Sequence, residues 1–397
     1  MSISLTARII RSVINKHDWP EQVRGAMGKS QPLRLLEVTN IINENKKGVI
    51  KLQSSLQSTD ADVLKQIKRK NLSIEQLQLL RDDHQSKTNS TEQYYTELIV
   101  PLPGMTHEKH MNTLRDVIDK AEMNTIEVFQ LILLQGSEMA TRSERDRLAF
   151  QTRFRAYVGA FGEYAIGGNM TPIVEIEEVV VETDTMSLDE YLDCRLAYLF
   201  VKVLVDGDTY KEIFCLIKHL GLFSFDVIQL FQNKYIERYG PLHELAQYFK
   251  DLTIDKLFES YDDLEAMVSK AEIVKKYKTG ELGANEILTC RVLAYRDYRE
   301  DINVALKEAV LDHIDSNGLL SEVIKDYIDE VMEFCQLRRF DFHDTRPERL
   351  RQDITRNFEF DFLAAEQHDF RVDPEDVRKE TWVTFQPQVF FHQPAQD

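Results

Sequence analysis

The sequence predicts an α/β protein: a partial βα barrel with about four parallel strands, then an all-helical domain and a short β tail. Two observations carry this prediction. Strand-like and helix-like segments alternate over residues 1–165, and apolar positions at helical spacing dominate residues 187–345. Strands that alternate with helices favour a parallel sheet with right-handed crossovers. The countable strands are fewer than a complete barrel requires.

The barrel-like part, residues 1–165, begins with a half-apolar helix that carries Leu5 and Ile9. This helix stops before Pro20, because proline interrupts a helix. Apolar runs bounded by turn residues then predict strands, and apolar residues three or four positions apart predict the helices between them. In chain order, we expect a strand at 22–27, a helix at 33–43, a strand at 49–56, a helix at 62–70, a strand at 94–100, a helix at 106–121 and a strand at 125–134.

Three further parts follow. Residues 166–186 contain a strand-like run that predicts a connecting strand, and its consecutive Val179, Val180 and Val181 suggest burial on both faces. Ser187 starts the helical domain, 187–345, through a capping box with the glutamate three residues later. In the tail, 346–397, phenylalanines alternate with acidic residues, and this pattern predicts a small antiparallel appendage.

Charge and hydropathy argue against several classes of partner. The 397 residues carry a formal net charge of −18, which disfavours a nucleic-acid backbone or an anionic membrane as the main partner. No apolar run approaches the roughly 20 residues that span a bilayer. The N-terminus lacks the apolar core and the small-residue cleavage site of a signal peptide. We therefore expect a cytoplasmic protein.

The chain has four cysteines, and their spacing matches no metal knuckle, redox pair or cluster loop. Each lies in an apolar, helix-like segment, so we expect free thiols buried as small hydrophobic side chains. The ten histidines form no pair at metal-binding spacing with a nearby acid, so no metal site is predicted. The GKS sequence at 28–30 lacks the preceding glycines of a phosphate-binding loop. The cysteines are Cys194, Cys215, Cys290 and Cys335.

Polar residues cluster at the end of the strand predicted at 49–56, where the ligands of such barrels bind. Ser55, Gln57 and Ser58 could hydrogen-bond a ribose or an amino group. The alternative is a local role, in which Ser58, Thr59 and Asp60 only cap the next helix, and Thr59 with Asp62 fits a capping box.

Glu97 lies inside the apolar strand TELIV, where a carboxylate is costly unless it is paired. It could accept hydrogen bonds from a ligand in the barrel lumen, and the alternative is a structural ion pair. Gln130 in the last predicted strand is a second inward polar candidate, with exposure at a sheet edge as the alternative. Arg153 and Arg155 alternate on an extended segment and could bind a phosphate or carboxylate of a substrate. The alternative is that both arginines form ion pairs with acidic residues at the surface.

Four segments, which lie mostly within residues 52–186 and reach Tyr191, resemble one enzyme family in order and spacing. They read QSTDADVLKQIKRKN, TELIVPLPGMT, FQLILLQGSEM followed by TRFR, and EIEEVVVETDTMSLDEY. On these segments the chain resembles the radical S-adenosylmethionine enzymes of the cobalamin-binding type. The resemblance implies a partial βα barrel in which a reduced 4Fe-4S cluster cleaves S-adenosylmethionine to a 5′-deoxyadenosyl radical. It also implies cobalamin in the complete relatives and a small-molecule or polysaccharide-related substrate.

The resemblance also implies roles for particular residues. It assigns the strand predicted at 49–56 to cofactor contact, and it implies that the loop with Gly104 packs against adenine. Pro101 stands where the family has glycine, and Met105 stands where it has glutamate, so this loop departs from the family pattern. The cofactor-binding candidates are Ser55, Gln57, Ser58, Glu97, Gly104 and Gln130, and the substrate-binding candidates are Arg153 and Arg155.

The family holds its cluster with three cysteines in a CxxxCxxC loop, and no part of this chain matches that loop. An iron–sulfur cluster needs thiolates that are gathered in space. We therefore expect a truncated radical S-adenosylmethionine protein that is inactive by itself, or one whose missing N-terminal half is a separate chain. The alternative is a non-catalytic binding or scaffold protein that keeps the barrel as a frame for helix-mediated contacts.

Overall fold

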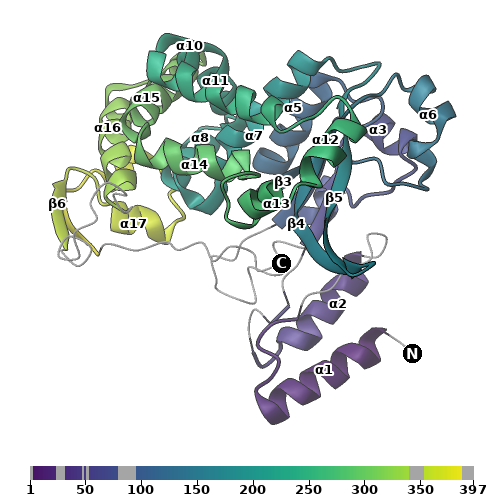
Figure 1. Ribbon diagram of the computed structural model, residues 1–397. Coiled ribbons are helices and arrows are strands. Elements are labelled where there is room, and N and C mark those ends of the chain that lie inside the picture. Colours follow the sequence, from purple (N-terminus) through teal and green to yellow (C-terminus); the bar gives the residue numbers. More distant parts are fainter. Residues whose placement is uncertain are drawn as a thin grey trace. The chain divides into compact units, whose positions relative to one another are not determined.

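The computed structural model describes a mixed α/β chain over residues 3–23, 32–46, 49–50, 53–78, 95–338 and 353–386 (Figure 1). The chain forms two compact units: the first comprises Met1–Cys194 with Phe258–Val274, and the second comprises Arg195–Leu257 with Lys275–Asp397. The GKS sequence at 28–30 and most of the strand predicted at 22–27 lie outside the described residues. The domain boundaries at 165, 186 and 345 stay a prediction.

Two helices open the first unit. α1 (Ile3–His17) and α2 (Pro32–Asn43) pack against each other, and both helices were predicted. The apolar face predicted for α1 is wrong, since Leu5 and Ile9 are exposed. A different side of α1 is buried, because residues two helical turns apart share a face and this face packs against α2. The shared core consists of Ala7, Ile14, Ile42, Val49 and Ile50.

A parallel sheet with strand order β1-β2-β3 forms the centre of the first unit. An isolated parallel bridge joins Val23 to Ile50 just before β1. The predicted alternation of strand and helix is confirmed here; three parallel strands are present, and the partial barrel stays a prediction. In chain order the elements are β1 (Gln53–Gln57), α3 (Ala61–Gln66), β2 (Tyr95–Val100), α5 (His107–Arg115) and β3 (Thr125–Gln130).

The two faces of this sheet differ in burial, because alternate residues of a strand point to opposite sides. One face is mostly apolar and buried, and on β2 and β3 it carries Leu98, Val100, Ile126 and Val128 together with the polar Thr96 and Gln130. The other face is only half buried and carries polar side chains, among them Tyr95, Glu97, Thr125 and Glu127. Parallel sheets are normally covered on both faces. The half-buried polar face is therefore the one available to a ligand.

The helix predicted at 106–121 is present but changes its pitch. α5 gives way to a π-helical turn, η1 (Asp116–Lys120), in which the Ala121 amide donates to the Asp116 carbonyl at 2.9 Å. Four apolar residues at helical spacing along this segment are buried: Met111, Leu114, Ile118 and Ala121. α3 is shorter than the helix predicted at 62–70, because Lys68 adopts a left-handed φ of 54° that a helix does not accept.

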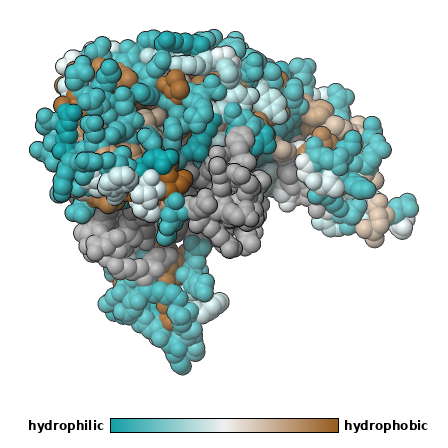
Figure 2. All heavy atoms as spheres, turned by 90° about the vertical axis from the view of Figure 1, so that its left-hand side faces the viewer, coloured by the Kyte–Doolittle hydropathy of each residue, from teal (hydrophilic) through white to brown (hydrophobic). Residues whose placement is uncertain are grey.

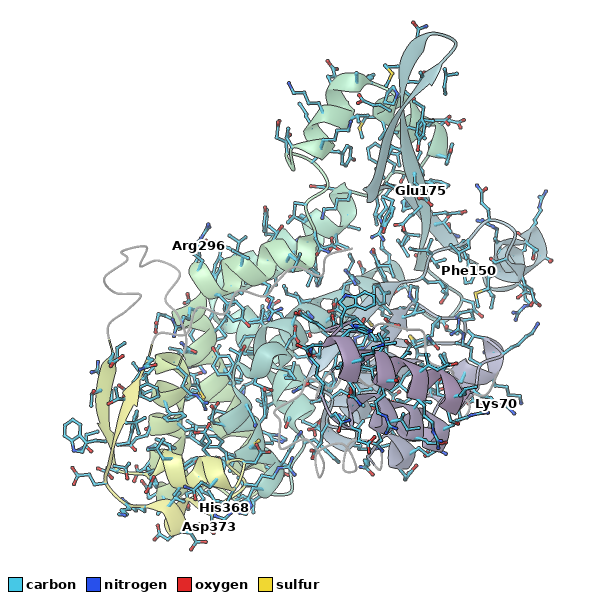
Figure 3. All side chains as sticks on the ribbon, turned by 90° about the horizontal axis from the view of Figure 1, so that it is seen from below. Lys70, Phe150, Glu175, Arg296, His368 and Asp373 are labelled. Carbon is cyan, nitrogen blue, oxygen red and sulfur yellow. The ribbon has the colours of Figure 1, made fainter. Side chains whose placement is uncertain are left out.

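A long antiparallel hairpin follows the parallel sheet. It consists of β4 (Gln151–Ile166) and β5 (Asn169–Glu182), and Figure 3 labels Phe150 at its base and Glu175 on β5. The strand predicted at 166–186 is therefore one half of a hairpin, and the predicted burial on both faces is confirmed at Val179, Val180 and Val181. Burial is complete only for three consecutive valines near its end, Val179–Val181.

The hairpin also explains why the strand predicted at 125–134 is too long. After Gln130 the chain leaves the parallel sheet, because the Leu133 amide donates to β5 at 2.9 Å and the Leu131 carbonyl accepts from β5 at 2.9 Å. β4 escaped prediction because an irregular register between Ala156 and Phe161 interrupts the alternation of its side chains.

The second unit is mostly helical, as expected for 187–345. α7 (Leu188–Leu204) begins with the predicted cap, in which the Ser187 amide donates to the Glu190 carboxylate at 2.8 Å. The further elements of the helical region are η3 (Asp206–Asp208), α8 (Lys211–His219), α9 (Ser224–Leu230), η4 (Phe231–Tyr235), α10 (Ile236–Arg238), α11 (Gly240–Asp255), α12 (Tyr261–Val268), α13 (Ala271–Lys278), α14 (Glu286–Arg296), α15 (Arg299–Ser316) and α16 (Glu322–Leu337); of these, α12 and the start of α13 belong to the first unit.

The predicted antiparallel appendage is confirmed at the end of the second unit. β6 (Ile354–Phe358) pairs with β7 (Thr381–Phe385), and α17 (Phe362–Gln367) lies between them in the chain. The phenylalanines that alternate in the sequence are buried, and Phe334 of α16 packs among them, 4.8 Å from Phe362 between ring centroids. Aromatic packing therefore holds the appendage against α16.

The face drawn in Figure 2 is mostly hydrophilic, with hydrophobic residues scattered over it, in keeping with the net charge of −18. Within the described ranges, no single helix has the length and apolar character needed to cross a bilayer. One helix pair, Lys211–His219 with Ser224–Arg238, meets both criteria jointly but is bent by 116°.

A buried charge cluster fastens α14 within the second unit. Glu286 accepts hydrogen bonds from Arg195 at 2.8 Å and from Lys256 at 3.0 Å. Burial by itself raises the pKa of Glu286, but the charges of Arg195 and Lys256 outweigh burial and hold the pKa at about 2. Removing the carboxylate would leave the buried Arg195 and the partly buried Lys256 without their anion.

We expect Glu286→Gln to lower the free energy of unfolding by about 2–4 kcal/mol at neutral pH. The folded-state pKa lies below the ordinary value of 4.5, so the stabilisation is present above that value and is lost as the pH falls towards 2. Urea unfolding at about pH 7 and about pH 3 should show a smaller difference between variant and parent at the lower pH.

The matched control is Glu237→Gln, because Glu237 forms an exposed pair with His243 at 3.3 Å. We expect this control to change stability by less than about 0.5 kcal/mol. An equal loss of stability in Glu286→Gln at both pH values would contradict the charge-pair explanation.

Candidate ligand site at the ends of the parallel strands

The candidate site lies along β1, β2 and β3, since ligands bind towards the carboxyl ends of parallel strands. The strand register places Ser55, Glu97 and Glu127 side by side. Ser55 Oγ donates a hydrogen bond to Glu97 Oε2, and the Tyr95 hydroxyl donates to Glu97 Oε1 at 2.9 Å. Both oxygens of the Glu97 carboxylate are thereby held in one orientation, and the partners that hold them are hydroxyl groups.

Tyr95 and Glu127 belong to this polar row although sequence reasoning missed both. Burial raises the pKa of Tyr95, and the charges of Glu97 and Glu127 raise it further, so the phenol stays neutral and remains a hydrogen-bond donor. A signal was available: YTELIV and TIEVFQ each place a glutamate third in a short apolar strand. Parallel pairing of two such strands brings the glutamates to the same level.

Gln57 occupies an unusual position at the last residue of β1. Its φ is 59°, in the left-handed region that disfavours side chains, and the register with β2 shifts between Ser55 and Gln57. The residue is only 5% exposed, and its Oε1 accepts no hydrogen bond within the described part of the chain. A buried acceptor without a donor costs about 1–3 kcal/mol. Backbone strain and an unsatisfied acceptor at one residue are typical of a binding position.

Ser58 is fully buried in the turn after β1, and its contacts are those of a turn residue. Its Oγ accepts from the Asp60 amide at 3.1 Å and lies 3.3 Å from the Thr113 hydroxyl of α5. The N-cap of α3 is Asp60, which accepts from the next amides, so the capping box predicted from Thr59 is wrong. The Thr59 hydroxyl instead donates to the Asp116 carboxylate at 2.8 Å.

Gly104 lies in the buried turn between β2 and α5, with a φ of 71°. A Cβ at this position would lie 2.2 Å from the Gln66 side-chain nitrogen, so the side chain of Gln66 occupies the space that glycine leaves open. Thr106 then caps α5 by accepting from the Lys109 amide at 3.2 Å. The side chain of Gln66, in the same unit, therefore makes the close contact that Gly104 permits.

Gln130, the last residue of β3, is buried rather than exposed at a sheet edge. Its side-chain nitrogen donates to the Tyr191 hydroxyl at 2.5 Å, and its side-chain oxygen accepts from Arg155. Arg155 also donates to Glu177 at 2.8 Å. Both ends of the Gln130 amide are therefore used to join β3 to the hairpin and to α7.

The other arginine candidate, Arg153, donates to Glu259 at 3.2 Å. Sequence reasoning missed a third arginine, Arg145, which forms a two-pronged hydrogen-bonded pair with Glu178 of β5. The hydrogen bond and charge of Arg145 lower the pKa of Glu178, although burial opposes the change. These arginines pair with acids of their own unit.

The four cysteines do not fit an iron–sulfur cluster. All are free and buried, and burial raises the pKa of Cys215 to about 11 and that of Cys290 to about 12. Thiols with such pKa values stay protonated at neutral pH, whereas a cluster binds thiolates. Cys335 donates to Glu212 at 3.1 Å, so it serves the core of the second unit. Among the described residues, no three histidine, cysteine or acidic side chains are placed to hold a metal ion.

We expect Gln130→Leu to lower the free energy of unfolding by about 1–3 kcal/mol, because the Arg155 and Tyr191 groups would lose a buried partner. Urea denaturation measures this difference. The control is Phe129→Tyr at the neighbouring residue, which is 48% exposed and points to the other side of β3. Unchanged stability in Gln130→Leu would mean that the amide is available to a ligand instead.

No protein-family profile matches this chain. It is 27% identical over 223 residues, 53% of its length, to 2-(S-pantetheinyl)-carbapenam-3-carboxylate methyltransferase of Streptantibioticus cattleyicolor. It is 26% identical over 207 residues, 51% of its length, to the cobalamin-dependent radical SAM methyltransferase TokK of Streptomyces tokunonensis. The matched regions span only 29% and 28% of those proteins. Over about half of its length, the chain is thus similar at low identity to a cobalamin-dependent radical SAM methyltransferase.

Proposed function

We propose that the first unit supplies strands of a partial βα barrel of the radical S-adenosylmethionine type, and that its polar sheet face binds S-adenosylmethionine. The proposal rests on the state of Gln57 at the end of a parallel strand. The backbone of this buried residue is strained, and its side-chain oxygen accepts no hydrogen bond from a described residue. The similarity to TokK supports the choice of cofactor. We further propose that the complete system methylates a small molecule with the help of cobalamin.

The residues of the site have distinct roles in this proposal. Gln57 Oε1 accepts a hydrogen bond from a donor group of the cofactor. Glu97, oriented by two hydroxyls, lies beside Glu127 and makes this face acidic, which suits the cationic ammonium and sulfonium groups of S-adenosylmethionine. Ser58 and Gly104 act indirectly, because they shape the turns that follow β1 and β2.

The two arginine candidates differ in placement. Arg155 is bonded to Gln130 at the end of β3, so it is the better placed of the two for a substrate carboxylate or phosphate. Glu177 already pairs with it at 2.8 Å and would have to be displaced or shared. Arg153 is directed to Glu259 instead.

The 4Fe-4S cluster of such enzymes would supply the electron that cleaves the sulfonium. The thiols of this chain do not fit that cluster, so any cluster that acts with this unit must bring its own thiolates. The same observation favours a second candidate function, in which the protein binds a nucleoside-containing ligand or a partner without catalysis.

We expect Gln57→Met to leave the unliganded protein as stable as the parent or up to about 2 kcal/mol more stable, because the variant removes an unsatisfied acceptor. The same variant should bind S-adenosylhomocysteine about 5- to 30-fold more weakly, since the ligand loses one hydrogen bond. Urea unfolding and isothermal titration calorimetry measure the two effects.

The control is Gln247→Met, which changes an exposed glutamine that donates to Asp251 at 2.8 Å in the second unit. A loss of stability in Gln57→Met would show that the amide has a protein partner. Failure of the parent protein to bind S-adenosylhomocysteine would count against the cofactor assignment.

We also expect anaerobic reconstitution with iron and sulfide to give no stoichiometric cluster on this chain alone, because its thiols are buried and protonated. Iron and sulfide analysis with Mössbauer spectroscopy measures this outcome. A tightly bound cluster would overturn the argument from the thiols, and ligand binding without a cluster would favour the non-catalytic candidate.

A further inference from the structure

The segment 183–193, which includes the start of α7, is bonded at three points to residues at or just after the ends of β2 and β3, all within the first unit. The Thr185 hydroxyl donates to the Met105 carbonyl at 3.0 Å, in the turn after β2. The Tyr191 hydroxyl accepts from Gln130 at the end of β3. His107 Nε2 lies 2.8 Å from Asp193 Oδ2. Residues 183–193 therefore run across the ends of β2 and β3.

Only the last of these contacts can change its charge near neutral pH. His107 is the first residue of α5, and its side chain and that of Asp193 are 33% and 31% exposed, so solvent protons reach the pair. The hydrogen bond to Asp193 raises the pKa of His107 above its ordinary value of 6.5; burial opposes this, and the charges of Asp193 and Glu190 add to it.

Three other charged residues lie close to His107 in space or in the chain, namely Glu190, Glu108 and Lys109. Glu190 on α7 accepts from the Ser187 amide and hydroxyl, so its carboxylate is held in the helix cap. On the helix of His107 itself, Glu108 and Lys109 follow directly, and Lys109 donates to Asp60 at 3.1 Å. Asp193 is thus the anion that contacts the imidazole directly.

We propose that His107 and Asp193 form a pH-dependent latch that fastens residues 183–193 over the ends of β2 and β3. The folded-state pKa of His107 is raised, so the stabilisation from its charged form is fully present below about pH 6.5 and is lost as the pH rises through the folded-state pKa. The latch needs no cofactor, and it goes beyond the proposed function because it operates in either candidate function.

The test combines histidine NMR with hydrogen exchange on the full chain without ligand. Asp193→Asn should shift the pKa of His107 down towards 6.5, as followed with ¹³C-labelled histidine. Amide protection factors over Leu188–Asp193 should fall roughly three- to tenfold between about pH 5.5 and about pH 8.5 in the parent protein. His107→Gln should abolish this pH dependence.

The matched control is His243→Gln, which removes the exposed histidine paired with Glu237 and should leave the pH dependence over Leu188–Asp193 unchanged. A pKa of His107 that does not respond to Asp193→Asn would overturn the proposal. Protection that stays constant with pH in the parent, or that still varies in His107→Gln, would overturn it as well. If His107→Gln does not fold, the Asp193→Asn titration alone decides.

Discussion

Parallel pairing of three short strands with unlike faces is the constraint on which the first unit depends. Side chains alternate along a strand, so the burial of Leu98 and Val128 in the core forces Glu97 and Glu127 to the opposite face. A shift of one residue would bury both carboxylates and expose the apolar row. The acidic face is therefore tied to the packing of the core, and neither can change without the other.

Two glutamines at the ends of strands in the same sheet show how the unit separates structure from binding. The Gln130 amide uses both of its ends, since it donates to Tyr191 and accepts from Arg155. Gln57 has a strained, left-handed backbone, and no described residue donates a hydrogen bond to its side-chain oxygen. A polar group that is fully bonded contributes to stability, whereas an unsatisfied one costs stability, and for Gln57 we propose that a ligand supplies the missing donor.

Similarity and local chemistry support different parts of the functional argument. The match to TokK covers about half of this chain and concerns its overall pattern of residues. Iron–sulfur chemistry depends on the ionisation of particular thiols, and burial raises the pKa of Cys215 and of Cys290. Sequence similarity to a radical enzyme can therefore extend over a region that lacks the sulfur donors of a cluster. A cysteine packed in a core and a cysteine that binds a metal need different surroundings.

Local patterns in the sequence predicted much of the secondary structure. Periodicity identified α1 and α2 and the alternation of strand and helix, and the serine–glutamate spacing identified the cap of α7. The helical region and the antiparallel tail were predicted in the same way. Glu97 could also be singled out, because a charge inside an apolar strand is visible in the sequence.

Contacts between distant segments could not be predicted. The hairpin of β4 and β5 depends on pairing over many residues and on an irregular register at Ala156 that hides the alternation. The partner of each site residue is likewise remote, as with Ser55 for Glu97 or Asp193 for His107. The sequence by itself determined which residues prefer helix, strand or burial, because these preferences are local. Only the tertiary structure decided which polar groups meet, because hydrogen bonds and charge pairs depend on distances between segments that lie far apart in the chain.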